Sequence, residues 1–298
     1  MTRPQPQLVV GASGLVGGAL IEAAGRRGIP AVGTYHRHAQ PGLLQLDIRN
    51  AASVDRFVRS VRPSVVHLAA AVGSADLCEV DTAAAAAVNV EGVQNVTTAA
   101  AGVGAHLVFF SSDYVFDGTA GPYSEDEPVA PICRYGELKV EAEQIVLAAG
   151  GLVVRTTVVY GWEEQGKNFV CRLLRTLAAG ATLDAPIDQL GSPTYAPNLA
   201  EVTLELAGRA ERGVLHVVGP HRIDRYGFAC AAARAFGLDE SLVLPVETRM
   251  LEQIAPRPLA AGMRPDRAQA LLQTRLVGYR EGLALMAAQG AAVSELAA

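Results

Sequence analysis

Short apolar runs alternate with helix-length amphipathic segments through the first half of this 298-residue chain. Six of these runs are strand candidates: residues 8–10, 31–35, 43–46, 65–68, 106–110 and 152–155. They are almost wholly apolar, which is typical of parallel strands that are covered on both faces. The segments between them are long enough for right-handed crossovers. The pattern therefore predicts an α/β protein with a Rossmann-type, doubly wound parallel sheet.

The alternation ends at about residue 160. Beyond it, the sequence predicts a helix over 166–174, a polar loop over 188–195, a late strand over 214–218 and a further loop at 257–259. We expect a dinucleotide-binding domain over 1–160 and a smaller, interleaved substrate-binding lobe over 161–298, with some segments that return to the sheet. Such a lobe would close over the crevice at the carboxyl edge of the sheet, where open α/β sheets bind ligands.

Composition excludes several classes of function. Half of the residues are hydrophobic and the net charge is −5, so nothing favours nucleic acid as a partner. No apolar run reaches the roughly 18 residues of a membrane span, and the first residues do not resemble a signal peptide. Four separated cysteines without a Cys-x-x-Cys pair predict free thiols and no metal site. We expect a cytoplasmic enzyme.

A glycine pattern follows the first strand candidate. Gly11, Gly14 and Gly17 are spaced Gly-x-x-Gly-x-x-Gly, and a helix is expected from Gly14 onward. Glycines in such a turn let backbone N–H groups approach a pyrophosphate at the positive end of the helix. A tight strand-to-helix turn without a ligand is the alternative. The contacts predicted here for a dinucleotide are Gly11, Ser13, Gly14, Leu15 and Val16.

The end of the second strand candidate indicates which dinucleotide. An NAD enzyme would normally carry an acidic residue there for the ribose 2′-hydroxyl. This chain has His36 and Arg37 instead, and an arginine can pair with a 2′-phosphate. We therefore expect NADPH, with NADH as the alternative and a solvated basic turn as the plain explanation. Asp47 and Ile48, after the third strand candidate, are expected at the adenine edge.

Tyr135 and Lys139 are four residues apart and would share one face of a helix. A cation beside a phenol favours the phenolate, so Lys139 is expected to lower the pKa of Tyr135. Chance occurrence on a solvated helix is the alternative for this spacing alone. Together with a dinucleotide turn, the pair predicts a hydride donor and a proton donor, which is the equipment of a carbonyl reductase.

Longer motifs carry a family resemblance. Residues 111–118, Ser-Ser-Asp-Tyr-Val-Phe-Asp-Gly, resemble the signature of the dTDP-4-dehydrorhamnose reductase-like (RmlD-like sugar-nucleotide reductase) branch of the extended short-chain dehydrogenase/reductases. Residues 67–71, 155–161 and 188–194 fall in the same order at family-like spacings. The resemblance covers essentially the whole chain. It implies NADPH-dependent reduction of the keto group of a nucleotide-linked 4-keto-6-deoxy sugar.

The resemblance also implies residue roles. Ser112, Tyr135 and Lys139 would be the catalytic triad, with serine in place of the more usual threonine. Tyr135 and Lys139 would also contact the cofactor, as would Leu68, Ala69 and Ala70 after the fourth strand candidate. The residues implied for substrate binding are Ser112, Asp113, Tyr114, Asn168, Gln189, Thr194 and Arg257.

Two departures lie on the substrate side. Val158 stands where rhamnose reductases typically have a substrate-facing tryptophan, and the Asn-Ser that usually follows Arg-Pro is missing after Pro258. Three alternatives therefore stay open: a non-catalytic NADP-binding regulatory subunit similar to the methionine adenosyltransferase beta subunit, a reductase of a non-sugar carbonyl compound, and a reductase of another nucleotide sugar. The sequence leaves the oligomeric state open, with a homodimer as one option.

Overall fold

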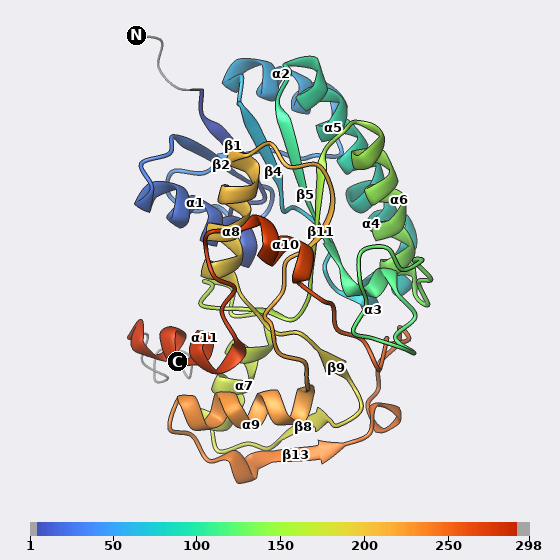
Figure 1. Ribbon diagram of the computed structural model, residues 1–298, viewed down its shortest axis with the longest axis vertical. Helices are drawn as coiled ribbons and strands as arrows, with labels where there is room; N and C mark the ends of the chain where they lie inside the picture. The colour runs from blue at the N-terminus through green and yellow to red at the C-terminus, as the bar shows by residue number, and fades with distance from the viewer. Residues whose placement is uncertain (1–4, 291–298) are drawn as a thin grey trace.

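A seven-stranded parallel sheet forms the centre of the computed structural model, which describes residues 5–290 (Figure 1). The strand order is β11-β6-β5-β4-β1-β2-β3, and each pairing is parallel. The strands are β1 (Gln7–Val10), β2 (Ala31–Tyr35), β3 (Leu44–Gln45), β4 (Val65–Leu68), β5 (His106–Ser112), β6 (Leu152–Thr156) and β11 (Gly213–His216). The strand order reverses between β1 and β4, which is where ligands of such sheets bind.

Helices cover both faces of the sheet because successive side chains of a strand point to opposite faces. Leu8 and Val10 of β1 pack with α2 (Ala51–Val61), α5 (Gly92–Gly102) and α6 (Arg134–Ala148). Val9 points the other way and packs with α1 (Leu15–Arg26), α8 (Ala196–Gly208) and α10 (Asp266–Leu271). The predicted doubly wound α/β fold is confirmed.

The chain between β4 and α5 is wholly helical after a short loop. It comprises α3 (Ala75–Val80), α4 (Thr82–Ala86) and a π-helical turn, η1 (Ala87–Glu91), which runs into α5. Asn89 lies buried in that turn. Its side-chain amide donates to the carbonyl oxygen of Val72 at 3.0 Å and accepts from the Val72 N–H at 2.8 Å. Asn89 therefore holds the loop that follows β4.

A smaller lobe lies below the sheet in Figure 1 and has its own hydrophobic core. Tyr160, Tyr195 and Phe228 are among the buried residues of that core. Its helices are α7 (Phe169–Ala178), α9 (Arg225–Ala235) and α11 (Tyr279–Ala288). Its short strands pair as β7 (Val159–Tyr160) with β10 (Thr194–Tyr195), β8 (Leu183–Pro186) with β13 (Val243–Val246) and β9 (Leu190–Gly191) with β12 (Ile223–Asp224). Three 3₁₀ turns complete the elements: η2 (Asp113–Val115), η3 (Glu240–Leu242) and η4 (Thr248–Met250).

The predicted strands are confirmed, including the late strand, which is β11. Two expectations for the smaller lobe were wrong in detail. The helix expected from Gly166 begins at Phe169, because Asn168 accepts a hydrogen bond from the Cys171 N–H and caps it. The polar loop expected over 188–195 contains β9 and β10. The division at residue 160 stays a prediction, and residues 1–4 and 291–298 of the two proposed domains lie outside the described part.

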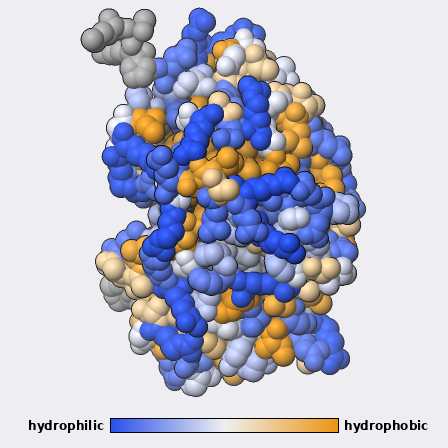
Figure 2. Space-filling view, in the orientation of Figure 1, coloured by the Kyte–Doolittle hydropathy of each residue, from blue (hydrophilic) through white to orange (hydrophobic). Residues whose placement is uncertain are grey.

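The four cysteines, Cys78, Cys133, Cys171 and Cys230, are free and buried. Among residues 5–290, no helix is both long and apolar enough to cross a membrane. The outline of the face in Figure 2 is notched on the left, between the upper and the lower lobe.

Candidate active site

Two neighbouring elements bring the predicted catalytic side chains together. Ser112 ends β5, and Tyr135 and Lys139 lie one turn apart in the first half of α6. Glycine at 136 lets this helix approach the chain after β5, because a Cβ there would lie 2.1 Å from the carbonyl oxygen of Tyr114. Ser112 and Lys139 are both buried. The three predicted residues therefore form one group at the carboxyl end of β5.

Lys139 is a buried cation. Its ammonium donates a hydrogen bond to the Phe110 carbonyl oxygen at 2.8 Å and lies 4.7 Å from the ring centroid of Phe109. Burial lowers the pKa of Lys139 to about 8, and the nearby carboxylate of Glu143 opposes that shift. Glu143 is itself buried and forms an ion pair with the buried Arg155 through two hydrogen bonds, at 2.9 and 2.6 Å. A lysine that retains a pKa near 8 stays mostly charged at neutral pH.

Tyr135 differs from the expectation. Burial is the largest cause that raises its pKa, and the neighbouring Tyr114 and Asp113 raise it further. The Tyr114 ring packs edge-on against it, with centroids 5.3 Å apart. Lys139 lies 5.7 Å from the Tyr135 ring centroid and bonds to Phe110 instead. The expected lowering of the Tyr135 pKa by Lys139 is therefore wrong for this arrangement, because burial outweighs the distant cation.

Ser112 is tied to a buried carboxylic acid. Its hydroxyl donates to Asp113 Oδ1 at 3.0 Å and accepts from the Tyr114 N–H at 3.3 Å, while Thr157 donates to Asp113 Oδ2 at 2.7 Å. Burial raises the pKa of Asp113, and the hydrogen bonds from Thr157 and Ser112 oppose that shift. A hydrogen bond with Ser112 also acts on Tyr135 and favours its phenolate. Asp113 therefore orients Ser112, and Ser112 contacts Tyr135.

The glycine turn between β1 and α1 has the form that a pyrophosphate needs. Gly11 has φ +90°, and a Cβ there would lie 2.7 Å from the Ala70 nitrogen. A Cβ on Gly17 would lie 2.3 Å from the Gly11 carbonyl oxygen, so both positions exclude a side chain. A Cβ on Gly14 would lie 3.5 Å from the Gly11 carbonyl oxygen, which already accepts from the Gly14 N–H at 3.1 Å, and this helix end has no side-chain cap. The uncapped N–H groups of the first turn of α1 fit an anionic cofactor.

The other positions predicted for the cofactor surround this turn. Leu15 and Val16 form the first turn of α1, and the Ser13 carbonyl oxygen accepts from the Gln165 amide at 3.0 Å. Ala69 is linked to β1 by its N–H, which donates to the Val10 carbonyl oxygen at 2.9 Å. Leu68 is 1% exposed and belongs to the core, so its side chain is closed to a ligand.

Some of the charged side chains in the segments after β2 and β3 pair with one another. Asp47 forms an ion pair with Arg49 at 2.7 Å and lies 3.5 Å from His36. The hydrogen bond from Arg49 is the first cause that lowers the pKa of Asp47 to about 2. Arg37 is exposed. Ile48 is buried against α5, where glycine at 92 makes room for it. Arg37 is thus available to a ligand, whereas Asp47 is already paired and the Ile48 side chain is core.

Two residues predicted for substrate binding have internal partners. Asn168 caps α7, and its amide also donates to the Gly161 carbonyl oxygen at 2.9 Å. Thr194 is 3% exposed. Its hydroxyl donates to the Ser192 carbonyl oxygen at 3.0 Å and accepts from the Gly219 N–H at 3.3 Å. Both side chains therefore shape the smaller lobe through internal hydrogen bonds.

Arg257 is already paired. It donates to Asp76 of α3 at 2.7 Å, and Asp76 also accepts from the Ala255 N–H at 2.9 Å. Gln189 donates to Gln253 Oε1 at 3.0 Å. The substrate-binding role that the resemblance implies for Arg257 therefore requires it to share its charge with Asp76.

Arg225 was missed by the sequence analysis. It is the first residue of α9, and its backbone N–H donates to the Gln189 carbonyl oxygen at 3.0 Å. Its guanidinium lies 5.3 Å from the Phe169 ring centroid. Burial lowers its pKa, while the nearby Tyr114 and Asp113 favour its charged form. Arg225 thus brings a cation from the smaller lobe toward the catalytic group. A lone arginine at a helix start gives no signal of this in the sequence.

The backbone of Val158 is also unusual, with φ +46°. A β-branched residue rarely adopts that conformation, and such strain is found mostly at functional positions. Val158 lies between β6 and β7, and its carbonyl oxygen accepts from the Thr194 N–H at 3.2 Å. This is the position that departs from the rhamnose reductases.

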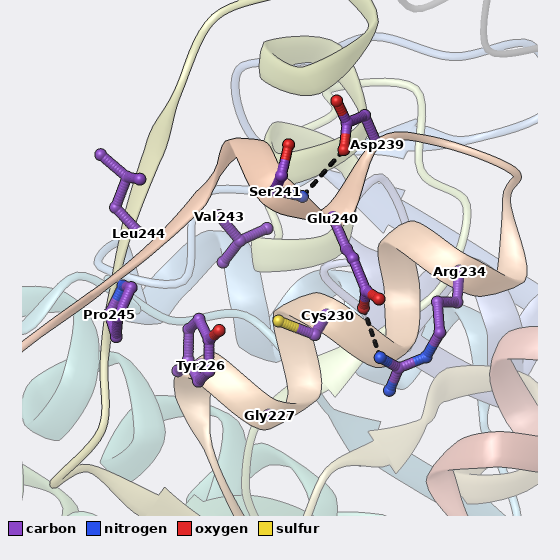
Figure 3. A pocket seen from close by; sticks show the side chains of 10 residues that line it. All are labelled: Tyr226, Gly227, Cys230, Arg234, Asp239, Glu240, Ser241, Val243, Leu244 and Pro245. Carbon is purple, nitrogen blue, oxygen red and sulfur yellow. Dashed lines mark hydrogen bonds and ion pairs between the residues drawn. The ribbon is translucent and has the colours of Figure 1, made fainter.

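A cavity of about 670 Å³ lies elsewhere, in the smaller lobe between α9 and β13 (Figure 3). Its charged side chains pair locally: Arg234 with Glu240, and Asp239 with the Ser241 N–H at 2.9 Å. All of its lining residues come from 226–245, away from the catalytic group. Within residues 5–290, no three His, Cys, Asp or Glu side chains are grouped so that they could hold a metal ion.

Known proteins resemble this chain over nearly its full length. A dTDP-4-dehydrorhamnose reductase from Mycobacterium tuberculosis is 37% identical over 263 residues, covering 86% of this chain and 83% of the relative. A methionine adenosyltransferase 2 subunit beta from Xenopus tropicalis is 33% identical over 267 residues, covering 87% and 78%. The crystal structure of dTDP-4-dehydrorhamnose reductase from Bacillus anthracis in complex with NADP superposes with a TM-score of 0.88 at 28% identity, covering 96% of this chain and all of the other.

The model of one protein family, described as the RmlD substrate binding domain, matches residues 7–291. The matched span includes the glycine turn, the Ser112–Tyr135–Lys139 group and the smaller lobe. On this match and on the fold, the chain belongs to the RmlD family of extended short-chain dehydrogenase/reductases.

Proposed function

We propose that this chain is an NADPH-dependent oxidoreductase that reduces the keto group of a nucleotide-linked 4-keto-6-deoxy sugar. The observation that carries this proposal is the grouping of Ser112, Tyr135 and Lys139 at the end of β5, in a chain of the RmlD family. Relatives named as dTDP-4-dehydrorhamnose reductases, one of them in complex with NADP, support the cofactor and the substrate class. The uncapped N–H groups of the first turn of α1 fit the cofactor's pyrophosphate.

Tyr135 is the proton donor in this proposal. When bound, the reduced nicotinamide supplies the hydride. Because burial raises the pKa of Tyr135, its phenol keeps its proton at neutral pH and can give it to a substrate oxygen on which negative charge develops. The product is then the alcohol, and the tyrosinate formed is reprotonated from solvent. The charged Lys139 favours that transient anion.

Ser112 positions the carbonyl group. Its hydroxyl contacts Tyr135 and is oriented by Asp113, so a carbonyl oxygen bound to Ser112 would also lie beside the phenol of Tyr135. Such positioning and hydrogen bonding are general sources of rate enhancement. The rotation of the serine hydroxyl from Asp113 toward the substrate costs one hydrogen bond, which the substrate replaces.

The nucleotide end of the substrate would meet the smaller lobe. Arg225 offers a half-buried cation near Tyr114, and Arg257 offers one that Asp76 already neutralises in part. Guanidinium groups bind phosphate oxygens through paired hydrogen bonds. Arg225 is therefore the leading candidate for the diphosphate, and the strained Val158 borders the sugar.

The experiment that tests this function is NADPH oxidation against a panel of dTDP-, UDP-, CDP- and GDP-linked 4-keto-6-deoxy sugars. We expect turnover with at least one nucleotide, and turnover at least about a hundredfold lower in the Tyr135→Phe variant. Failure of every sugar nucleotide, with turnover of a non-sugar ketone, would move the proposal to that substrate class.

A second function has support in the comparisons, since relatives named methionine adenosyltransferase 2 subunit beta are 31–33% identical. Such a subunit would bind NADP and a partner enzyme without turnover. The complete catalytic group argues for the reductase. NADPH binding without reduction of any carbonyl substrate, together with capture of a methionine adenosyltransferase, would favour the subunit. A homodimer and a cytoplasmic location stay predictions.

A further inference from the structure

The chain has only two lysines, although arginines are frequent. Lys139 belongs to the catalytic group. Lys167 is exposed and lies in residues 161–168, a connection of the smaller lobe that joins β7 to α7. We call these residues the β7–α7 loop. The catalytic proposal gives Lys167 no role, and its position is well defined by the contacts of the loop.

Glu163 organises the β7–α7 loop internally. Its Oε1 atom accepts from the Lys167 N–H at 2.9 Å, from the Asn168 N–H at 2.6 Å and from the Asn168 amide at 2.9 Å. Gly166 supplies the turn, with φ +57° and an N–H that donates to the Glu163 carbonyl oxygen at 3.1 Å. The backbone at Lys167 is thus held by a compact turn, so its side chain starts from a defined place.

The same loop is docked on the dinucleotide-binding half. Gln165 donates to the carbonyl oxygen of Ser13, in the glycine turn, at 3.0 Å. Glu164 accepts from the amide of Gln40, five residues beyond the end of β2, at 2.5 Å. The β7–α7 loop therefore bridges the glycine turn and the segment that follows β2, although 124 residues separate Gln40 from Glu164.

A cavity of about 480 Å³ lies between these segments, which is within the size range of small-ligand pockets, roughly 300–1,000 Å³. Its lining residues are Arg37, His38, Ala39, Glu164, Gln165 and Lys167. Two of these side chains, those of Arg37 and Lys167, are basic, and they come from different lobes. Glu164 is the one carboxylate among them. The chemistry of the lining favours an anion that can reach both Arg37 and Lys167 while it avoids Glu164.

We propose that Lys167 is a specificity-determining residue for NADPH, which completes with Arg37 a two-lobed site for the 2′-phosphate. This inference rests on the proposed function. With the pyrophosphate at the Gly11–Gly17 turn, the adenosine end of the cofactor runs toward the end of β2, where Arg37 lies. The lysine ammonium is a compact charge that suits phosphate, and Arg37 adds a planar fork. A cofactor without the 2′-phosphate gives Lys167 no anion to bind.

The carboxylate of Glu164 should have the opposite effect to Lys167 on the binding of a 2′-phosphate. It lines the same cavity and would repel a 2′-phosphate, and it does not repel a 2′-hydroxyl. Removal of the lysine charge should therefore weaken the binding of a 2′-phosphate, and removal of the glutamate charge should strengthen it. If both residues only held the loop in place, the two substitutions would change ligand affinity in the same direction. The change would then be the same for ligands with and without a 2′-phosphate.

Calorimetry of the full chain with adenosine 2′,5′-bisphosphate and with 5′-AMP separates the contribution of the 2′-phosphate. For Lys167→Met we expect about tenfold weaker binding of the bisphosphate, the low end for a charge-assisted hydrogen bond at an exposed site, and less than about a twofold change for 5′-AMP. Glu164→Gln should bind the bisphosphate more tightly than the unsubstituted protein. The control is Arg249→Met, which removes an exposed cation paired with Glu247. It should leave the affinity for both ligands unchanged.

Equal changes for the two ligands, or no change in Lys167→Met, would overturn the assignment of Lys167 while leaving NADPH binding intact. If the unsubstituted protein bound neither the bisphosphate nor NADPH, the proposed function itself would fall, and the assignment with it. The two failures are thus distinguishable in one set of titrations.

Chemical labelling gives an independent readout that needs no substitution. Lys139 is 4% exposed, so an amine-directed reagent applied to the native chain should modify Lys167 and the terminal amine, which peptide mass spectrometry resolves. We expect adenosine 2′,5′-bisphosphate and NADPH to protect Lys167 and 5′-AMP to leave it reactive. Labelling of Lys167 that continued unchanged under saturating bisphosphate would contradict the proposal.

Discussion

The ammonium nitrogen of Lys139 lies 2.8 Å from the carbonyl oxygen of Phe110, two residues before Ser112 on the same strand. This hydrogen bond ties α6 to the carboxyl end of β5. Because Tyr135 is on the same face of α6 as Lys139, the bond also sets the distance between the phenol and the serine hydroxyl. One buried cation therefore positions two of the three proposed catalytic groups.

The first prediction concerns the proton donor. Tyr135→Phe removes the phenol oxygen and keeps the ring that packs against Tyr114. We expect turnover to fall by at least about a hundredfold, the usual scale for loss of a general acid, with NADPH affinity retained. Single-turnover kinetics and NADPH fluorescence titration measure the two quantities. Near-normal turnover in this variant would refute the role of Tyr135.

The second prediction is a pH dependence. Burial lowers the pKa of Lys139 to about 8, so the ammonium loses its proton as the pH rises through that value. We expect kcat/KM for NADPH to fall above about pH 8, because this parameter follows the free enzyme. The alkaline decline should be absent from the residual activity of Lys139→Met. A profile that is flat from pH 7 to 9.5 in the unsubstituted enzyme would contradict the assignment.

The third prediction concerns the choice of cofactor. Arg37 is exposed beside the end of β2, where an acidic ribose ligand would stand in an NAD enzyme. Arg37→Ala should weaken the binding of NADPH by roughly 1.5–3 kcal/mol and leave the binding of NADH almost unchanged. Only NADPH loses a charge-assisted hydrogen bond to its phosphate. Calorimetry with both cofactors tests it. Equal losses, or a native preference for NADH, would show that Arg37 faces solvent only.

The fourth prediction compares two arginines on the substrate side. Arg257 is neutralised by Asp76 at 2.7 Å, whereas Arg225 is half-buried, and the nearby Tyr114 and Asp113 favour its charged form. Arg225→Met should weaken a bound nucleoside diphosphate by about 1–3 kcal/mol, and Arg257→Met should weaken it less. The measurement is calorimetry with dTDP, UDP, CDP and GDP in the presence of NADPH. If none of them bound below about millimolar concentration, the nucleotide-sugar substrate would be rejected.

The fifth prediction concerns acid stability. Burial lowers the pKa of His67 and His216 to about 3, against about 6.5 for an exposed histidine. As the pH falls from 6.5 toward 3, the unfolded chain binds protons that the folded chain cannot bind. The free energy of unfolding should therefore decrease by about 1.4 kcal/mol per pH unit for each histidine.

The control for acid stability is a double substitution. His67 bonds to Gln7 at 2.7 Å, so His67→Leu with Gln7→Leu removes both partners and leaves no unpaired amide. Urea unfolding at pH 4.5, 5.5 and 6.5 should show a shallower pH slope for this variant. An identical slope would show that His67 does not contribute.

The local sequence pattern was enough to predict the main features of the fold. The apolar runs at 8–10, 65–68 and 106–110 are buried on both faces, and that double burial is what makes a strand apolar throughout. The glycine turn and the Tyr135–Lys139 spacing are local too, since a turn and one helical turn involve few residues. Features of this kind depend on neighbours in sequence, so a single chain contains their signal.

The electrostatics of the site required the folded molecule. The expectation that Lys139 lowers the pKa of Tyr135 followed from spacing alone, and burial reversed it, because desolvation is a property of the surrounding packing. The pairing of Arg257 with Asp76 joins residues 181 positions apart. The family resemblance implied that Asn168 and Thr194 bind substrate. In the folded chain, the Asn168 side chain caps a helix and the Thr194 hydroxyl forms internal hydrogen bonds.

The sequence by itself determined the parallel sheet, the glycine turn and the spacing of the proposed catalytic residues, because hydrophobic period, glycine spacing and helical spacing are short-range properties. Only the tertiary structure decided which charges meet. It brought Arg225 toward Asp113 and docked the β7–α7 loop, with Lys167, on the dinucleotide-binding half. Those contacts arise from the way the smaller lobe packs against the sheet, and no local pattern records how two distant segments pack.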